Sequence, residues 1–293
     1  MRQAGGLSHG LPARVCYIGF LMPSFLETSM EIAREAGALL SRYFEKRVTY
    51  QLKGEFDLVT EADRASEQLV VERLRAHFPT HSIVAEEGGG RDAGSEYRWY
   101  VDPLDGTTNF FHGFPMFNVT LGLERAGQMI AGCIYDPLRD EMFAAELGAG
   151  AWLNGSPIQV SKIPRLEEAL VATGFPSRKR HLNVNVHFFY QMSMWSQGAR
   201  RAGSAALDLA YVACGRLDAY WEFGLKPWDM AAGVLLVAEA GGKVSDMRGG
   251  PFEIGGPHVL ADNALVHDEV LELFGEVFAG RYRTPLPHPN LVT

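Results

Sequence analysis

The segment 102–105, Asp-Pro-Leu-Asp, sets two carboxylates three residues apart, directly after a short aromatic and β-branched run at 99–101. That run predicts a buried strand. Pro103 lacks the N–H that a central strand needs, so the chain is expected to turn there. The Gly-Thr-Thr-Asn that follows at 106–109 favours the start of a helix. The sequence therefore predicts two carboxylates on one tight turn, beside the free N–H groups of a helix.

Carboxylates held this close repel each other unless a cation neutralises them. Their hard oxygens favour Mg²⁺, Mn²⁺ or Ca²⁺ over zinc. The N–H groups at the start of a helix favour an anion such as phosphate. The segment therefore indicates a metal-bridged phosphate site, and the alternative is an ordinary turn rich in Asp and Gly.

Glu86 and Glu87 follow a short predicted strand at 82–85. If this strand neighbours the strand that ends at Asp102, Glu86 and Asp102 can face the same cation. The alternative is a solvent-facing acidic pair at the end of a strand.

Asp63 and Asp229 each lie in the first turn of a predicted helix. Thr60 is expected to cap the first of these helices, and Pro227 is well placed in the first turn of the second. The helix dipole alone favours a carboxylate at this end, which is the plainer interpretation of both residues. The Trp-Asp pair and the small residues at 228–233 favour more than capping, because small residues let the helix approach another backbone closely.

Hydrophobic spacing and turn signals give a coarse division of the chain into elements. The expected helices cover 24–47, 61–78, 183–195, 205–214, 227–240 and 268–278. The expected strands cover 48–50, 82–85, 99–101, 117–123, 129–135, 141–145, 151–153, 170–173, 199–202, 217–221, 243–245 and 259–261. The four strands between 117 and 153 are predicted to form an antiparallel meander, and Asn154-Gly155 predicts a hairpin turn.

A shift in composition at 161–168 predicts a boundary between two lobes. The expected parts are a disordered extension at 1–21, an N-terminal α+β lobe with the metal-binding loops at 22–160, a C-terminal α/β lobe at 161–281, and a flexible tail at 282–293.

The chain has 293 residues and a formal net charge of -8, with no tract of Lys and Arg. Nucleic acid is therefore a poor candidate for a partner. An anionic substrate needs local positive charge, which metal ions supply most simply. The three cysteines form no Cys-x-x-Cys pair, which favours a reducing, cytoplasmic setting. No apolar run approaches the length of a membrane span, so no membrane association is expected.

The segment 102–110 resembles the first motif of the inositol monophosphatase family of metal-dependent phosphatases, and 228–233, Trp-Asp-Met-Ala-Ala-Gly, is similar to its second. The resemblance extends from about Met22 to about Phe278 in the family's order. It implies an α+β fold, the layered αβαβα sandwich of the inositol monophosphatase and fructose-1,6-bisphosphatase type, and a homodimer.

The resemblance also implies two or three Mg²⁺ ions, with Mn²⁺ as a substitute, and hydrolysis of a phosphate monoester by a metal-activated water. The implied metal ligands are Glu86, Asp102, the backbone carbonyl of Leu104, Asp105 and Asp229. The implied catalytic residues are Glu86, Asp63 as proton acceptor and Thr107 as its relay. The implied substrate contacts are Gly106, Thr107, Arg200, Gly203, Ser204, Ala205, Glu222 and Asp229. Either Arg200 or its neighbour Arg201 could reach the substrate, and a surface or interface pair is the alternative.

Glu222 and the compact Gly-Ser-Ala-Ala at 203–206 favour a small phosphorylated polyol, with inositol monophosphate as the leading substrate. Fructose 1,6-bisphosphate, histidinol phosphate and a 3′-phosphonucleotide are the alternatives. The resemblance further implies inhibition by Li⁺. Because some relatives are implicated in RNA-polymerase-associated regulation, a regulatory binding protein that keeps the fold is the alternative from another class. The presence of every expected acidic ligand favours an active enzyme.

Overall fold

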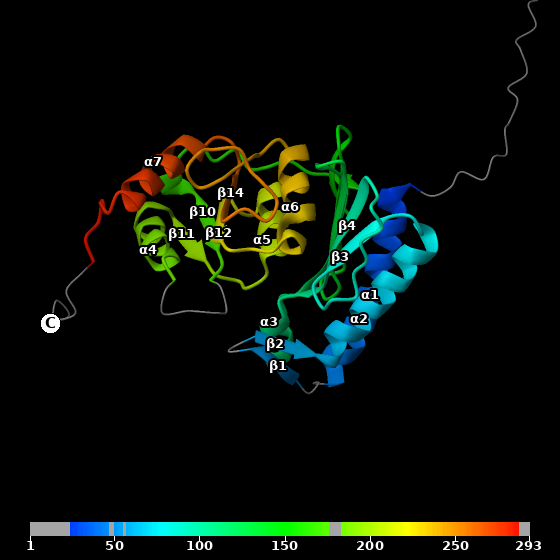
Figure 1. The fold of residues 1–293 in the computed structure, drawn as a ribbon. Helices are drawn as coiled ribbons and strands as arrows, with labels where there is room; N and C mark the ends of the chain where they lie inside the picture. The colour runs from blue at the N-terminus through cyan, green and yellow to red at the C-terminus, as the bar shows by residue number, and fades with distance from the viewer. Residues whose placement is uncertain (1–23, 47–49, 55–56, 176–182, 287–293) are drawn as a thin grey trace, which may run out of the picture.

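The computed structural model describes residues 24–46, 50–54, 57–175 and 183–286, and Figure 1 shows the fold. The extension expected at 1–21 and the end of the expected tail, 287–293, lie outside the described residues. The helices are α1 (Phe25–Lys46), α2 (Glu61–His77), α3 (Thr107–His112), α4 (Asn185–Trp195), α5 (Ala205–Ala213), α6 (Pro227–Glu239) and α7 (His267–Phe278). None of the helices in the described ranges is both long enough and apolar enough to cross a membrane.

Three sheets are present in the described ranges. A hairpin pairs β1 (Tyr50–Gly54) with β2 (Asp57–Thr60). A seven-stranded sheet has the order β3 (Ser82–Ala85), β4 (Tyr97–Asp105), β5 (Asn118–Arg125), β6 (Gln128–Asp136), β7 (Glu141–Glu146), β8 (Gly150–Leu153) and β9 (Ser156–Pro157). A five-stranded sheet has the order β11 (Gly198–Arg200), β10 (Leu170–Thr173), β12 (Ala219–Phe223), β14 (His258–Asp262) and β13 (Lys243–Ser245).

The elements stack as five layers. Helices α1 and α2 cover the outer face of the seven-stranded sheet, and α5 and α6 lie between the two large sheets (Figure 1). Helices α4 and α7 cover the outer face of the five-stranded sheet, where they share an apolar core with β10, β12 and β14. The fold is therefore the α+β layered sandwich that the resemblance implies.

Local sequence explains why the helices begin where they do. Thr60 caps α2: its side chain accepts from the backbone N–H of Asp63, and the Asp63 carboxylate accepts from the backbone N–H of Thr60. Pro227 opens α6, where its missing N–H is not needed. Ser204 caps α5 through the N–H of Leu207. These caps fix the ends of the helices that carry predicted site residues.

Helix α6 lies unusually close to the seven-stranded sheet. A Cβ on Gly132 of β6 would lie 2.9 Å from the Ala232 Cα, and a Cβ on Gly122 of β5 would lie 2.9 Å from the Ala231 Cβ. Glycine on the sheet and alanine on the helix therefore allow this approach, as the small residues at 228–233 predict. The predicted lobe boundary at 161–168 lies between the strands of the seven-stranded sheet and those of the five-stranded sheet in the sequence. Helix α6, which follows this boundary, nevertheless packs directly on the seven-stranded sheet. The division into two lobes therefore stays a prediction.

Strand β4 differs from its prediction. It continues through Pro103 to Asp105, whereas the sequence predicts a turn at the proline. The register with β5 shifts at this point: Asp102 pairs with Thr120 and Asp105 pairs with Asn118. Two residues of β4 thus lie opposite one residue of β5. At this bulge Pro103 is not required to donate a hydrogen bond to β5, so its missing N–H is tolerated.

One further expectation, on a strand, needs correction, and the flexible tail stays a prediction. Strand β12 covers Ala219–Phe223 instead of 217–221, because the turn after α5 extends to Asp218. Residues 282–286 of the expected flexible tail contact α4, where the buried Gln191 side chain donates to the Thr284 carbonyl (2.7 Å) and accepts from the Thr284 N–H (3.1 Å).

Candidate active site

The strands β3 and β4 are parallel neighbours, with Ala85 opposite Val101. Glu86 and Asp102 therefore follow the same edge of the sheet, as their positions in the sequence predict. The Glu86 N–H donates to the Val101 carbonyl at 3.3 Å, which holds the end of β3 against β4. The bulge in β4 then places Asp105 close to the same edge.

A cavity of about 460 Å³ opens at this edge, between the seven-stranded sheet and α5, α6 and β12. The predicted site residues that line it are Glu86, Asp102, Leu104, Asp105, Gly106, Thr107, Gly203, Ser204, Ala205, Glu222 and Asp229. Two predicted residues do not line it, Asp63 and Arg200. Arg201 does line it, so the structure places the neighbour of Arg200 at the cavity.

Asp102 is the most buried of the carboxylates that the β4 segment contributes, with 2% of its surface exposed. Burial raises the pKa of Asp102 well above its ordinary value, and the nearby carboxylates of Glu86, Asp105 and Asp229 raise it further. The Leu104 N–H donates to its Oδ1 at 3.0 Å. Such a carboxylate gains most from a cation.

Asp229 reaches the same cavity from the first turn of α6. Its carboxylate accepts from the Lys226 N–H at 2.7 Å. Burial raises the pKa of Asp229 well above its ordinary value, and the carboxylates of Asp105 and Glu86 add to the effect. Helix α6 thus carries a carboxylate from the second half of the chain to the acidic residues of the first half.

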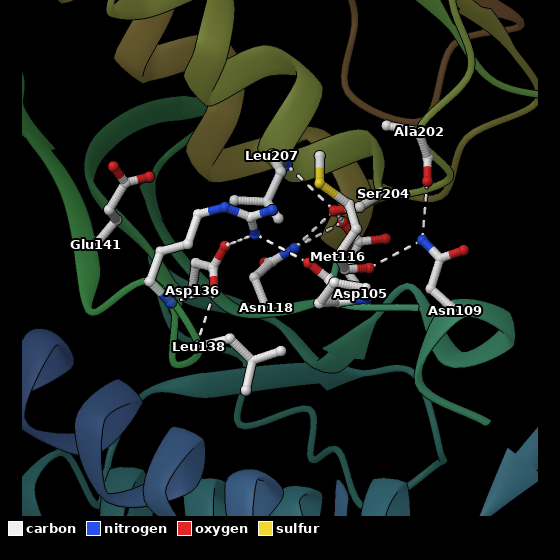
Figure 2. A network of polar contacts seen from close by, with 12 residues as sticks. Asp105, Asn109, Met116, Asn118, Asp136, Leu138, Glu141, Ala202, Ser204 and Leu207 are labelled. Carbon is white, nitrogen blue, oxygen red and sulfur yellow. Dashed lines mark hydrogen bonds and ion pairs between the residues drawn. The ribbon is translucent and has the colours of Figure 1, made fainter. Parts of the chain in front are cut away.

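Asp105 is held by a polar network that Figure 2 shows. Its Oδ2 accepts from the Ser204 hydroxyl at 2.7 Å, from the Asn118 amide at 2.9 Å and from the Ala206 N–H at 3.0 Å. Burial raises the pKa of Asp105, and these hydrogen bonds oppose the rise. The network joins β4 and β5 to the start of α5.

Asn109 makes a second connection between the two halves. Its Nδ2 donates to the Met116 carbonyl at 2.8 Å and to the Ala202 carbonyl at 2.8 Å, so it ties α3 to the segment before α5 (Figure 2). The sequence motifs give no role to Asn109 or Asn118. The signal for Asn118 is an asparagine at the start of the apolar strand β5, because asparagine is disfavoured in strands.

Asp63 does not line the cavity, but its side chain contacts Thr107, which does. The Thr107 hydroxyl is 3.0 Å from Asp63 Oδ1 and 3.1 Å from the Leu104 carbonyl, and it can donate to one of them at a time. The capping box of α2 fixes the other oxygen of Asp63 through the Thr60 N–H at 2.7 Å. A proton leaving the cavity can therefore reach Asp63 through Thr107.

Glu222 lines the cavity from β12. The Tyr220 hydroxyl donates to Glu222 at 2.5 Å, because side chains two apart in a strand share a face. Burial raises the pKa of Glu222 to about 7. Gly174 leaves the space for this carboxylate: a Cβ there would lie 1.9 Å from Glu222 Oε2.

The donor set of the cavity fits hard divalent cations. Its acidic residues are Glu86, Asp102, Asp105, Asp208, Glu222 and Asp229, and its basic residues are Arg201 and Lys226. Among the described residues, the lining contains carboxylates and no His or Cys, which matches Mg²⁺ or Mn²⁺ better than zinc. Within the described ranges, no group of three or more His, Cys, Asp or Glu side chains is already arranged to hold a metal ion.

Comparisons with known proteins agree with this geometry. The family model described as the inositol monophosphatase family matches residues 22–277. The chain is 46% identical to Nus factor SuhB of Pseudomonas aeruginosa, over 83% of this chain and 92% of that one. It is 44% identical to inositol-1-monophosphatase of Synechocystis, over 85% of this chain and 89% of that one.

Solved structures are similar across the same range. The inositol monophosphatase of Anabaena (Nostoc) matches with a TM-score of 0.77 at 45% identity, over 85% of this chain and 94% of that one. SaIMPase-II with inositol monophosphate bound matches with a TM-score of 0.74 at 28% identity, over 87% of this chain and 96% of that one. The chain therefore belongs to the inositol monophosphatase family of metal-dependent phosphatases.

Proposed function

We propose that this phosphatase hydrolyses the phosphate monoester of a small polyol, with inositol monophosphate as the leading substrate, to the polyol and inorganic phosphate. The observation that carries the proposal is the arrangement of the cavity. Carboxylates from three separate segments line one cavity, and Glu222, an acceptor for hydroxyl groups, lines it with them. The relative with inositol monophosphate bound supports the same substrate.

The metal ligands in this proposal are Glu86, Asp102, the Leu104 carbonyl, Asp105 and Asp229, which would hold two or three Mg²⁺ ions. Mg²⁺ supplies a lowered pKa for water and neutralises charge on the phosphoryl oxygens. In the proposal, Thr107 orients the attacking water and Asp63 receives its proton through the Thr107 hydroxyl. The 3.0 Å contact between these two side chains supports the relay.

Substrate contacts in the proposal come from both halves of the chain. The backbone around Gly106 and Thr107 holds the phosphate, while Gly203, Ser204, Ala205 and Glu222 face the polyol. Arg201 takes the role that the resemblance implies for Arg200, because Arg201 lines the cavity. The family's phosphate esters fructose 1,6-bisphosphate, histidinol phosphate and a 3′-phosphonucleotide are the competing substrates.

The proposal also includes a homodimer, inhibition by Li⁺ at the second ion, and a cytoplasmic location. Cys133 and Cys214 are free thiols, which supports a reducing compartment. A regulatory binding role beside catalysis is a second candidate, because relatives of high identity carry the name Nus factor SuhB.

Phosphate release with and without EDTA, in wild-type protein and Asp102→Asn, tests the enzyme. We expect Mg²⁺-dependent phosphate release from the wild-type protein, and we expect EDTA to abolish it. For the variant we expect kcat to fall by at least about 100-fold, since mutation of residues that only hydrogen-bond to metal ligands already lowers activity by up to about 100-fold. Equal release by the variant and the wild type would overturn the assignment. A panel of the four esters then decides the substrate: a higher kcat/KM on one of the three competitors would replace inositol monophosphate.

A further inference from the structure

Asp208 is a buried carboxylate for which the proposed function has no role. It lies on α5 with 2% of its surface exposed, and it lines the cavity. Within the part of the chain that the structure describes, its side chain accepts no hydrogen bond and forms no ion pair. The nearby charges are the carboxylates of Glu222 and Asp105, which oppose its ionisation, and the guanidinium of Arg201, which favours it.

Among the described residues no enclosed side-chain oxygen or nitrogen lacks a hydrogen-bond partner, so the carboxylate of Asp208 is accessible from the cavity that it lines, and its presence there calls for an explanation. The plainest one is the helix dipole, because Asp208 lies in the first turn of α5. That effect does not require the carboxylate to face a cavity. On the exposed side of a helix it would be equally favourable, as at Asp268 in the first turn of α7. Asp208 instead faces a space of substrate size.

The neighbours of Asp208 suggest what it binds. Glu222 lines the same cavity from β12, and its carboxylate is near enough to Asp208 to oppose the ionisation of Asp208. In the proposed function the ester's phosphate binds at the metal ligands, so the alcohol part of the ester occupies the rest of the cavity. A polyol carries several hydroxyl groups on adjacent carbons, and each can donate to a carboxylate. Two neighbouring carboxylates that line one cavity can receive two such hydroxyls.

We propose that Asp208 is a specificity-determining residue that binds a second hydroxyl group of the substrate alongside Glu222. This inference rests on the proposed function, because it concerns the alcohol part of the same ester. It predicts that the enzyme distinguishes esters by the number of hydroxyl groups that they carry away from the phosphate. Burial and the carboxylates of Glu222 and Asp105 raise the pKa of Asp208 well above its ordinary value, and the guanidinium of Arg201 opposes this rise.

Steady-state kinetics on two substrates test the inference: inositol 1-phosphate, and p-nitrophenyl phosphate, which has no hydroxyl group on its alcohol part. Asp208→Ala is expected to lower kcat/KM for inositol 1-phosphate by about 10- to 100-fold, mainly through KM, because a hydrogen bond to a charged group is lost. On p-nitrophenyl phosphate we expect a change of less than about 3-fold. Asp208→Asn, which keeps an acceptor oxygen, is expected to recover part of the loss.

Asp268→Ala is the matched control, because it removes a first-turn carboxylate that faces solvent. It should leave kcat/KM for both substrates unchanged. If Asp208→Ala lowers kcat/KM equally for both substrates and also lowers Tm, the residue is structural and the inference is wrong. If kcat/KM changes for neither substrate, the inference is also wrong. Failure of the proposed function looks different, since the wild-type enzyme would then release no phosphate from inositol 1-phosphate with Mg²⁺.

Discussion

Asp102 and Asp105 lie in the same bulge but differ in how their charge is stabilised. Asp105 accepts from a hydroxyl, a side-chain amide and a backbone N–H, whereas Asp102 accepts from the Leu104 N–H. The protein's own hydrogen bonds therefore hold Asp105 in place. Asp102, whose pKa is raised well above its ordinary value, would gain its stabilisation from a bound cation.

Asp105→Asn is expected to weaken the second ion while leaving the first nearly unchanged, because Glu86 and Asp102 hold the first in the proposed arrangement. We expect a loss of about 10- to 100-fold in affinity for the second ion. Calorimetric titration with Mg²⁺ or Mn²⁺ measures both sites. Ser204→Ala, which removes only one hydrogen bond to Asp105, serves as a milder comparison, and equal loss at both ions in Asp105→Asn would contradict the arrangement.

Glu222 gives the metal-free protein a pH-dependent stability. Its pKa rises from an ordinary value of 4.5 to about 7 on folding, so the folded protein binds the proton more tightly than the unfolded chain. Stability therefore falls as pH rises from about 4.5 to about 7, by up to about 3 kcal/mol. Glu222→Gln should remove this part of the dependence. Urea unfolding in EDTA at pH 5 and pH 8 measures this dependence. If the free energy of unfolding falls by the same amount between the two pH values in the wild type and in the variant, the raised pKa of Glu222 is refuted.

At the scale of elements, the contact between α6 and the seven-stranded sheet positions Asp229. Gly132 on β6 leaves the space for Ala232, whose Cα would lie 2.9 Å from an added Cβ. Any larger side chain on β6 at this point must push the helix away or strain the strand.

Gly132→Val is therefore expected to cost about 1–3 kcal/mol or more of stability and to weaken metal binding through displacement of Asp229. Gly275→Ala is the control, because this exposed glycine lies inside α7 with no atom within 4 Å of an added Cβ. It should stabilise the protein by about 0.5–1 kcal/mol without affecting metal affinity. Chemical unfolding and Mg²⁺ titration of both variants provide the measurements, and unchanged stability in Gly132→Val would show that the contact is looser than described.

The elements show which features the sequence predicts and which it cannot. Thr60 and Pro227 begin their helices as predicted, because capping depends on neighbouring residues alone. The effect of Pro103 depends on the partner strand: a bulge against β5 removes the need for its N–H, and no local pattern reveals the bulge. The choice between Arg200 and Arg201 likewise depends on which side of the extended chain faces α5 and β12.

The same reasoning applies to the site. Residue type and spacing indicate a metal site at Asp102 and Asp105, and the family resemblance adds Glu86 and Asp229 as ligands. Asn118 and Ser204 are 86 residues apart and meet only when β5 and α5 are packed together. Asp208 escapes notice for the same reason, since an acid in the first turn of an apolar helix has an ordinary explanation until the cavity is visible.

At the scale of the whole molecule, the cavity joins the two halves of the chain. Glu86, Asp102 and Asp105 come from the seven-stranded sheet, and Asp229 comes from α6 in the second half. Without a cation, these carboxylates repel each other across the contact between the halves. An ion bound between them would replace this repulsion by attraction and would link the halves.

Mg²⁺ is therefore expected to stabilise the entire molecule. At 100 times its Kd it should raise the free energy of unfolding by about 2.7 kcal/mol, because it binds the folded state alone. Tryptophan fluorescence and far-ultraviolet circular dichroism should report one coincident transition in urea, since the ion connects both halves. In Asp102→Asn the gain should shrink towards zero, and an equal ionic strength of KCl should have little effect on wild type. Two separate transitions, of which Mg²⁺ shifts only one, would show that the ion is held by one half, and the shared metal site would then be wrong.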